Sequence, residues 1–261
     1  MLGFICLGWL AACAAAGREA VPLRVTAAVT ETAVMTATPF ATETAVPQPC
    51  ANLSTGDVAM RFLALGDSYT IGESVAEAER WPVQLAALLR EQGVSVADPV
   101  IVARTGWTTD ELATGIAQAP PQGPFDLVSL LIGVNNQYRG RAIEEYREQF
   151  ANSLAQAIEF AGGDSRRVFV LSIPDWSVTP FAQRQRGNTG QIAAEIDAFN
   201  AVNLEESAKQ GVLYVDVTPI SREAAQDSAL LAADGLHPSG VMYGRWAALA
   251  LPQLCTQLAG D

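Results

Sequence analysis

Five short apolar runs, separated by longer segments of helical period, constrain the fold of this chain more than any other feature. The runs occupy residues 58–66, 95–103, 125–133, 167–174 and 211–217. A strand with one solvated face alternates polar and apolar residues, whereas these runs are nearly continuous. They therefore predict strands that are buried on both faces of a sheet.

The segments between and after these runs have the apolar spacing of helices. In residues 141–163, the side chains of Tyr146, Phe150 and Leu154 fall on one stripe, as expected for a helix that packs one face against a sheet. The same spacing predicts helices over 78–93, 189–211 and 239–255. Strands that alternate with helices imply a parallel sheet covered on both faces. We therefore expect an α/β fold, a three-layer α/β/α sandwich with a parallel sheet of about five strands.

The chain has room for one such domain with appendages. It contains 261 residues, of which 49% are hydrophobic and 17% are charged, and this is enough apolar material for a packed core. The net charge of −12 argues against a nucleic-acid partner, because proteins of that class present clustered Lys and Arg to the phosphate backbone.

The first residues, 1–16, form an apolar and uncharged segment. As a helix this segment would span about 24 Å, less than the roughly 30 Å hydrocarbon layer of a bilayer, so we expect a cleaved signal peptide rather than a transmembrane helix. The stretch LAAC at 10–13 resembles the lipobox of bacterial lipoproteins, although no Lys or Arg precedes the apolar run. This resemblance implies cleavage before Cys13 and attachment of diacylglycerol to its thiol. A plain signal peptide or anchor with an incidental cysteine is the alternative.

The next segment, residues 17–56, is rich in Thr and Pro and shows no sustained period, which predicts a disordered tether. We expect this tether to hold a folded domain, residues 57–261, away from a membrane surface. The expected location is extracytoplasmic, with the protein either a lipoprotein of the bacterial cell membrane or surface, or secreted.

Two further cysteines, Cys50 and Cys255, bracket the predicted domain. An exported protein lies in an oxidising compartment, so we expect these cysteines to pair. Closing so long a loop would stabilise the fold by about 5 kcal/mol on a chain-entropy estimate. Two buried free thiols are the alternative. No Cys/His cluster in the sequence suggests a metal site.

Chemically useful side chains follow the first predicted strand. That strand ends in LALGDSYTIG, where Gly66 permits a tight turn and Asp67 and Ser68 stand at the entrance to a helix. A hydroxyl on such a turn is exposed, and nearby helix N–H groups can stabilise an oxyanion. The other interpretation is that Asp67 and Ser68 are ordinary helix caps.

Further polar residues follow the later strands. Gly106 follows the second predicted strand, and Gly133 and Asn135 follow the third. The only histidine, His237, lies three residues after Asp234 and just ahead of the last predicted helix. Ser becomes an effective nucleophile when His removes its proton, and a carboxylate can orient that His. Because the carboxyl ends of parallel strands share one edge of the sheet, we expect these residues to meet there.

In this order, the blocks resemble those of the SGNH, or GDSL, hydrolase superfamily over about residues 58–258. The resemblance implies a flavodoxin-like fold with Ser68 as nucleophile, His237 as base and Asp234 as the residue that orients His237. It also implies an oxyanion hole formed by the backbone N–H groups of Ser68 and Gly106 and by the side-chain amide of Asn135.

The sequence departs from the family pattern at two positions. Tyr69 stands where Leu is usual, and Asn136 stands where Asp is usual. Compared with the usual Asp, Asn136 is polar but uncharged. This departure affects the expected rigidity of the loop more than the expected catalysis.

The function implied by the resemblance is that of a serine esterase that works through an acyl-enzyme and needs no metal or organic cofactor. The substrate would be a small-molecule ester, with short acyl esters, lysophospholipids and acetylated sugars all open. The candidates to line a substrate pocket are Asp67, Trp107, Tyr138, Trp176 and Phe181. Arg184 and Arg186 are candidates to meet an anionic group, although residues 174–190 can equally be an ordinary loop. We expect a monomer; a non-catalytic envelope- or carbohydrate-binding module on the same fold is the alternative function.

Overall fold

The structure is a computed structural model that describes residues 50, 53, 58–185 and 188–260. The expected signal peptide, the lipidation candidate Cys13 and nearly all of the expected tether lie outside the described residues, as does Arg186. The described residues belong to one compact unit.

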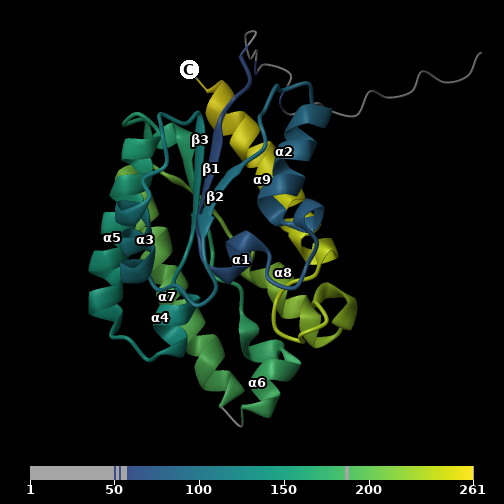
Figure 1. Cartoon of the computed structure of the whole chain (residues 1–261). Helices are drawn as coiled ribbons and strands as arrows, with labels where there is room; N and C mark the ends of the chain where they lie inside the picture. Colours follow the sequence, from purple (N-terminus) through teal and green to yellow (C-terminus); the bar gives the residue numbers. More distant parts are fainter. Residues whose placement is uncertain (1–49, 51–52, 54–57, 186–187, 261) are drawn as a thin grey trace, which may run out of the picture. The chain divides into compact units, whose positions relative to one another are not determined.

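A five-stranded parallel sheet forms the centre of this unit (Figure 1). Its strands lie in the order β2-β1-β3-β4-β5, which is the flavodoxin-like order, and all neighbours are parallel. Their bounds are β1 (Phe62–Gly66), β2 (Val100–Ala103), β3 (Leu127–Leu131), β4 (Val168–Leu171) and β5 (Leu213–Val215). The predicted α/β fold with five parallel strands is therefore confirmed.

The five strands are shorter than the apolar runs and differ in burial. β1, β3 and β4 are buried along their whole length because each lies between two other strands. β2 and β5 are the edge strands and are partly exposed, with 43% of Val100 accessible to solvent. The expectation of burial on both faces is thus wrong for β2 and β5. An apolar run does not reveal whether its strand has a neighbour on each side.

Helices cover both faces of the sheet, as expected (Figure 1). On one face α2 (Trp81–Glu91) packs against α9 (Gly240–Ala259). The opposite layer contains α3 (Thr109–Gln118), α5 (Ile143–Phe160) and α7 (Thr189–Gln210). The four predicted helices are present, and α3 is an additional one.

Shorter helices occupy the connections. The α-helical ones are α1 (Ser68–Ile71), α4 (Val134–Tyr138), α6 (Pro180–Arg184) and α8 (Thr218–Arg222). The 3₁₀ turns are η1 (Glu77–Glu79), η2 (Ser165–Arg167), η3 (Trp176–Val178), η4 (Glu223–Ala225) and η5 (Ser228–Leu230). Several of these lie beyond the carboxyl ends of the strands, where the connecting loops build the site described below.

A disulfide joins Cys50 to Cys255, with 4.8 Å between their Cα atoms. Both residues are almost completely buried, and Cys255 belongs to α9. The disulfide therefore fixes the start of the described chain to its last helix, 205 positions away.

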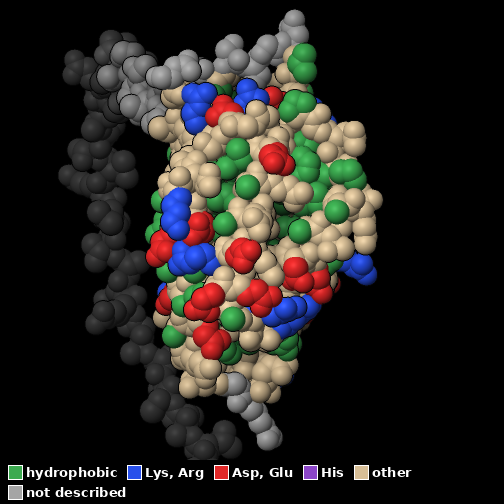
Figure 2. Space-filling model, turned by 90° about the vertical axis from the view of Figure 1, so that its left-hand side faces the viewer, with side chains coloured by type: hydrophobic (Ala, Val, Ile, Leu, Met, Phe, Trp, Pro, Cys, Tyr) green, Lys and Arg blue, Asp and Glu red, His purple; other side chains and the backbone are tan. Residues whose placement is uncertain are grey.

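The outer face of the α3 and α5 layer carries charged side chains among uncharged and hydrophobic ones (Figure 2). Acidic and basic side chains are interspersed there, and some form exposed ion pairs such as Arg141–Glu145 at 3.2 Å. Such pairs contribute little to stability because water screens them. Among the described residues, no helix is both long enough and apolar enough to span a membrane.

The chain order places the carboxyl ends of β1 and β3 at a crevice. β1 lies between β2 and β3. α2 follows β1 and covers one face, whereas α5 follows β3 and covers the other (Figure 1). Sheets of this kind bind ligands where successive connections diverge in this way.

Candidate active site

Ser68 is positioned by a turn that requires glycine. It is the first residue of α1 and directly follows the β1 turn. A Cβ atom on Gly66 would lie 2.3 Å from the carbonyl oxygen of Leu131, so any larger residue would push β1 away from β3. Asp67 then caps α1, because its side chain accepts a hydrogen bond of 3.0 Å from the backbone N–H of Tyr69.

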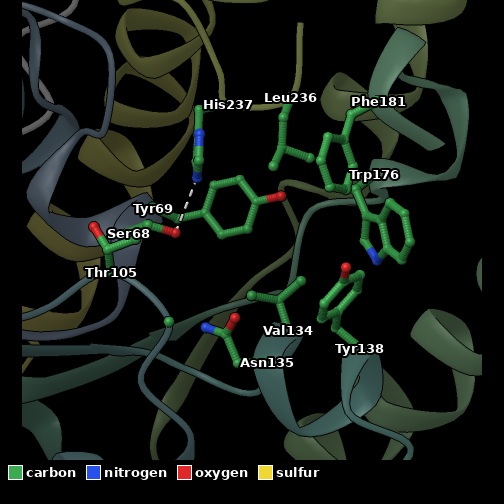
Figure 3. A pocket seen from close by; sticks show the side chains of 11 residues that line it. Ser68, Tyr69, Thr105, Val134, Asn135, Tyr138, Trp176, Phe181, Leu236 and His237 are labelled. Carbon is green, nitrogen blue, oxygen red and sulfur yellow. Dashed lines mark hydrogen bonds between the residues drawn. The ribbon is translucent and has the colours of Figure 1, made fainter. Parts of the chain in front are cut away.

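The side chains of Ser68, His237 and Asp234 form a continuous hydrogen-bonded series, of which Figure 3 shows the Ser68–His237 part. Ser68 Oγ lies 3.0 Å from His237 Nε2, and His237 Nδ1 lies 2.6 Å from Asp234 Oδ2. A carboxylate can only accept, so Nδ1 carries the proton and Nε2 is left to accept from the Ser68 hydroxyl. Residues 169 positions apart in the sequence thus meet with the geometry that a serine nucleophile and its base need.

Asp234 is held as a carboxylate by the hydrogen bonds that it accepts. Its Oδ1 accepts hydrogen bonds from the backbone N–H groups of Leu236 and His237, at 2.9 and 3.0 Å. Partial burial acts to raise the pKa of Asp234, but hydrogen bonds from His237, Ser74 and these N–H groups outweigh it and lower the pKa from 3.8 to about 2. Asp234 therefore stays charged wherever it would need to stabilise an imidazolium.

Two further groups can donate hydrogen bonds in front of Ser68. Gly106, which has a φ of +83°, lines the cavity beside Ser68. Asn135 lines the same cavity. The Nδ2 of Asn135 donates one hydrogen bond of 2.9 Å to the carbonyl oxygen of Trp107. This bond fixes the orientation of the amide and leaves its second hydrogen for an oxyanion.

Asn136, at the position where the sequence departs from the family pattern, lies underneath the site. It is buried, its Oδ1 accepts a hydrogen bond from the backbone N–H of Thr109, and its Nδ2 donates one to Thr109 Oγ1. A neutral amide can do both, whereas a carboxylate could only accept. Asn136 thus ties the α4 loop to the start of α3 without a buried charge.

A cavity of about 170 Å³ opens in front of Ser68 and His237 (Figure 3). Tyr138, Trp176 and Phe181 form one wall, with ring centroids 5.6 to 6.5 Å apart. The indole Nε1 of Trp176 donates to Gln137 Oε1 at 2.9 Å, which fixes the ring. The remaining lining residues are Tyr69, Thr105, Gly106, Val134, Asn135 and Leu236. None of the described Asp, Glu, Lys or Arg residues lines this cavity, so it suits an uncharged group.

Metal ligands do not gather anywhere in the described chain. Within those residues, no group of three or more His, Cys, Asp or Glu side chains is placed to hold an ion.

The sequence profile of the GDSL-like lipase/acylhydrolase family matches residues 64–245, which is well over half of the chain. The chain belongs to this family. The match includes Ser68, Gly106, Asn135, Asp234 and His237 and makes the protein a GDSL hydrolase.

Solved structures share the fold of this GDSL hydrolase. The lipase/acylhydrolase from Enterococcus faecalis is 20% identical and has a TM-score of 0.57, with 75% of this chain and 96% of that chain covered. A G-D-S-L lipolytic protein from Veillonella parvula is also 20% identical, at a TM-score of 0.55 and coverages of 74% and 97%. The psychrotrophic esterase EstA from Pseudoalteromonas sp. is 15% identical, at 0.53, with coverages of 73% and 93%. No curated protein matches the sequence.

Asp67 does not line the substrate cavity of the GDSL hydrolase, contrary to expectation. It is completely buried beneath α1, where its Oδ1 caps the helix and its Oδ2 has no hydrogen-bond partner among the described residues. Burial raises the pKa of Asp67 from 3.8 to about 7, against the opposing effect of hydrogen bonds from the backbone N–H groups of Tyr69 and of Asp67 itself. Because the side chain of Asp67 caps α1, it is directed into the protein and away from the cavity.

Trp107 and Arg184 also lie outside the cavity. Trp107 lines a neighbouring polar groove of about 400 Å³, which shares Thr105 and Gly106 with the cavity. Arg184 turns to the carbonyl oxygen of Asp234, 3.4 Å from its guanidinium. Trp107 follows Gly106 in the sequence but does not share its place in the cavity, because successive loop residues point in different directions.

Four cavity residues were not anticipated: Thr105, Val134, Leu236 and Tyr69 as a wall residue. Val134 and Leu236 lie inside the Gly-x-Asn and Asp-x-x-His blocks, so their positions within these motifs were the available signal. Tyr69 packs its ring against the imidazole of His237, with 5.5 Å between centroids. This contact explains why a large aromatic side chain fits after the nucleophile.

Proposed function

We propose that this GDSL hydrolase is a serine esterase that forms an acyl-enzyme at Ser68. The observation that carries the proposal is the hydrogen-bonded series from Asp234 through His237 to Ser68, which ends at an apolar cavity. A purely structural cap at Ser68 would need neither the imidazole nor the carboxylate behind it.

In the first half of the reaction, Ser68 Oγ attacks the ester carbonyl carbon while His237 Nε2 takes the hydroxyl proton. The carbonyl oxygen becomes an oxyanion, which the N–H groups of Ser68 and Gly106 and the Nδ2 of Asn135 stabilise. The bond to the alcohol oxygen then breaks, and His237 gives its proton to that oxygen. Asp234 stabilises the imidazolium throughout without taking the proton.

In the second half, water replaces the alcohol. His237 removes a proton from the water, whose oxygen attacks the acyl carbon of the Ser68 ester. The oxyanion forms at the same donors, the bond to Ser68 Oγ breaks, and the proton returns to Ser68. The sum is one ester and one water converted to one acid and one alcohol.

The acyl group of the proposed substrate is small and uncharged. The cavity of about 170 Å³ is smaller than the roughly 300–1,000 Å³ typical of sites for drug-sized ligands. Its wall of Tyr138, Trp176 and Phe181 is apolar, and Leu236 and Val134 complete it. Short-chain acids match both the size and the polarity.

The alcohol portion of the proposed substrate is polar. The groove lined by Trp107 adjoins the cavity at Thr105 and Gly106, and its other side chains include Arg104, Glu111 and Gln118. A leaving group that extends from the oxyanion position into this groove meets donors and acceptors rather than an apolar wall. These features favour esters of short acids with polyols over esters with long apolar chains.

Hydrolysis of nitrophenyl esters of increasing acyl length tests the proposal, alongside an acetylated oligosaccharide. We expect acetate and butyrate esters to be cleaved faster than long-chain esters, and Ser68→Ala to lose nearly all turnover. Equal turnover in Ser68→Ala would exclude Ser68 as nucleophile. No turnover by the wild type on any ester would favour the non-catalytic binding module.

We also propose that the chain is exported and held at a membrane by a lipid on Cys13, with residues 17–56 as a tether. The apolar start of the chain and the LAAC stretch support this location. Metabolic labelling with a radioactive fatty acid, compared between the wild type and Cys13→Ser, tests it. Label on both proteins or on neither would contradict lipidation at Cys13.

A further inference from the structure

Ser74 has an unfavourable backbone conformation close to the active site. With a φ of +66°, it is the only non-glycine residue of positive φ in the part of the chain that the structure describes. Side chains with a Cβ rarely adopt this left-handed region, and where they do the surrounding structure requires it. Gly72, two residues earlier, ends α1 with a similar φ of +67°. The two residues turn the chain sharply just beyond Ser68.

This turn brings the Ser74 hydroxyl to the carboxylate of Asp234, 160 positions away in the sequence. Ser74 Oγ donates a hydrogen bond of 2.7 Å to Oδ2, the oxygen that also accepts from His237 Nδ1. The two hydrogen bonds to Oδ1 come from the N–H groups of Leu236 and His237. A carboxylate has about four acceptor sites, and these four bonds fill them. Among the described residues, Ser74 is the one donor from outside the Asp234 loop.

The hydroxyl is not needed to build the turn. The backbone N–H of Glu73 donates to the Ser68 carbonyl at 3.0 Å, and that of Val75 donates to the Gly72 carbonyl at 3.3 Å. The carboxylate of Glu73 also accepts a hydrogen bond from the Thr105 hydroxyl. Removing the Ser74 hydroxyl leaves these contacts in place, so its role can be tested separately from the fold.

We propose that Ser74 is a positioning residue that limits how strongly Asp234 holds protonated His237. The proposal rests on the proposed function, in which His237 is the base. The hydroxyl takes up part of the negative charge of Oδ2 and fixes the plane of the carboxylate. Without this donor the carboxylate attracts the imidazolium more strongly, so His237 keeps its proton to higher pH and is less available as a base.

Substitution of Ser74 leaves the other titratable groups near the imidazole unchanged. Tyr69 packs against the imidazole ring. The ionisable groups that act on Tyr69 include Asp67 before α1 and Asp175 before η3. Glu73 lies in the same turn as Ser74, and Arg184 on α6 reaches the carbonyl oxygen of Asp234. Among the described side chains, Asp234 and Ser68 are the hydrogen-bond partners of the imidazole. A change in the protonation of His237 would therefore report on the Asp234 carboxylate.

Ser74→Ala and Ser74→Gly together separate the hydroxyl from the backbone. Both variants lose the hydroxyl, but glycine adopts a φ of +66° without strain, whereas alanine keeps the Cβ that disfavours it. His237 is the only histidine in the chain, so NMR of tag-free protein follows its protonation directly. We expect the midpoint of its titration to rise by about 0.5–1 pH unit in both variants, and kcat/KM at a fixed pH on the acidic limb to fall about three- to tenfold. The acidic limb of kcat/KM should move with the NMR midpoint, whereas Tm should be lower for Ser74→Ala than for Ser74→Gly.

Ser74→Asn is the conservative variant. Asn tolerates left-handed backbone better than other residues with a Cβ, and its amide can donate to Oδ2, so we expect the midpoint to return toward that of the wild type. The proposal is overturned if neither Ala nor Gly shifts the midpoint. It is also overturned if Ser74→Gly has the wild-type midpoint while Ser74→Ala does not. The left-handed backbone, and not the hydroxyl, would then explain why Ser74 matters.

Failure of the proposed function gives a different result. If the wild type hydrolyses no ester, both proposals fall, whatever the NMR titration shows. If the wild type hydrolyses esters through Ser68 and the Ser74 variants have unchanged midpoints, only the role of Ser74 is refuted.

Discussion

At the scale of single residues, the two amide hydrogens of Asn135 have different roles in the proposed reaction. One is bonded to the Trp107 carbonyl, which leaves the other to meet the oxyanion. We predict that Asn135→Ala lowers kcat by about 10²–10³-fold with little change in KM, because the donor acts mainly in the transition state. Asn152→Ala, an exposed position on α5, is the matched control and should retain full activity. A rise in KM alone would instead indicate that Asn135 binds the ground state.

Asp67 gives a prediction about stability and pH. Its pKa is about 7 in the fold against 3.8 in the unfolded chain, so the folded state binds one more proton between these values. The free energy of unfolding contributed by this group therefore falls as pH rises from about 4 to about 7. Asn keeps the cap and has no charge to bury. We predict that Asp67→Asn gains stability relative to the wild type over this range, then stays level above pH 7.

Urea unfolding of both proteins at pH 4, 5.5, 7 and 8 measures this difference. A constant difference between Asp67→Asn and the wild type across these pH values would mean that Asp67 titrates normally in the fold. Asp126→Asn is a suitable control, because its side chain is far more exposed than that of Asp67.

The sequence predicts single residues well where a motif carries them and poorly elsewhere. Ser68, Asp234 and His237 were expected to meet because each follows a recognisable signal, and their atoms do lie within hydrogen-bond distance. Ser74 gave no such signal, because its contact with Asp234 depends on a left-handed turn and on two loops 160 positions apart. Local sequence does not encode either condition.

At the scale of secondary-structure elements, α3 supports the oxyanion region through Gly115. A Cβ there would lie 2.2 Å from the Trp107 ring, whose backbone carbonyl holds Asn135. In an exposed helix Gly→Ala stabilises by about 1 kcal/mol, but here the displaced ring reverses the sign. We predict that Gly115→Ala lowers the free energy of unfolding by about 1–3 kcal/mol and also lowers kcat.

Thermal unfolding and ester hydrolysis measure these two effects. Gly190→Ala in α7 is the matched control, because a Cβ there meets nothing closer than 3.4 Å, and it should be neutral or stabilising. An increase in Tm for Gly115→Ala would show that Trp107 moves freely and does not support Asn135.

The elements also show what periodicity can predict. Helices such as α5 have long apolar stripes and were anticipated, whereas α3 has ten residues and buries only Thr109, Leu112 and Ile116. Its start is marked instead by a capping box, in which the Glu111 side chain accepts a hydrogen bond from the backbone N–H of Thr108 at 3.0 Å. Strand burial at the sheet edges could not be predicted, because it depends on the strand order rather than on each strand.

At the scale of the whole molecule, the Cys50–Cys255 disulfide links the two ends of the described chain. It closes a loop of more than 200 residues in the unfolded state, so we predict that Cys255→Ser lowers the free energy of unfolding by about 4–5 kcal/mol. Esterase activity at 25 °C should persist, because Cys255 lies about 22 Å along α9 from the loop that holds His237.

Differential scanning calorimetry of the wild type, the reduced wild type and Cys255→Ser tests this prediction. The last two should unfold at the same temperature, below the wild type. Equal Tm values for all three would contradict a stabilising role of the disulfide.

The most direct test of the catalytic account is the mass of the intact protein after treatment with a fluorophosphonate, followed by peptide mapping of the adduct. We predict one adduct per chain, located on Ser68, absent in Ser68→Ala and formed far more slowly in His237→Ala. An adduct on another residue, or labelling of Ser68→Ala at the wild-type rate, would contradict it.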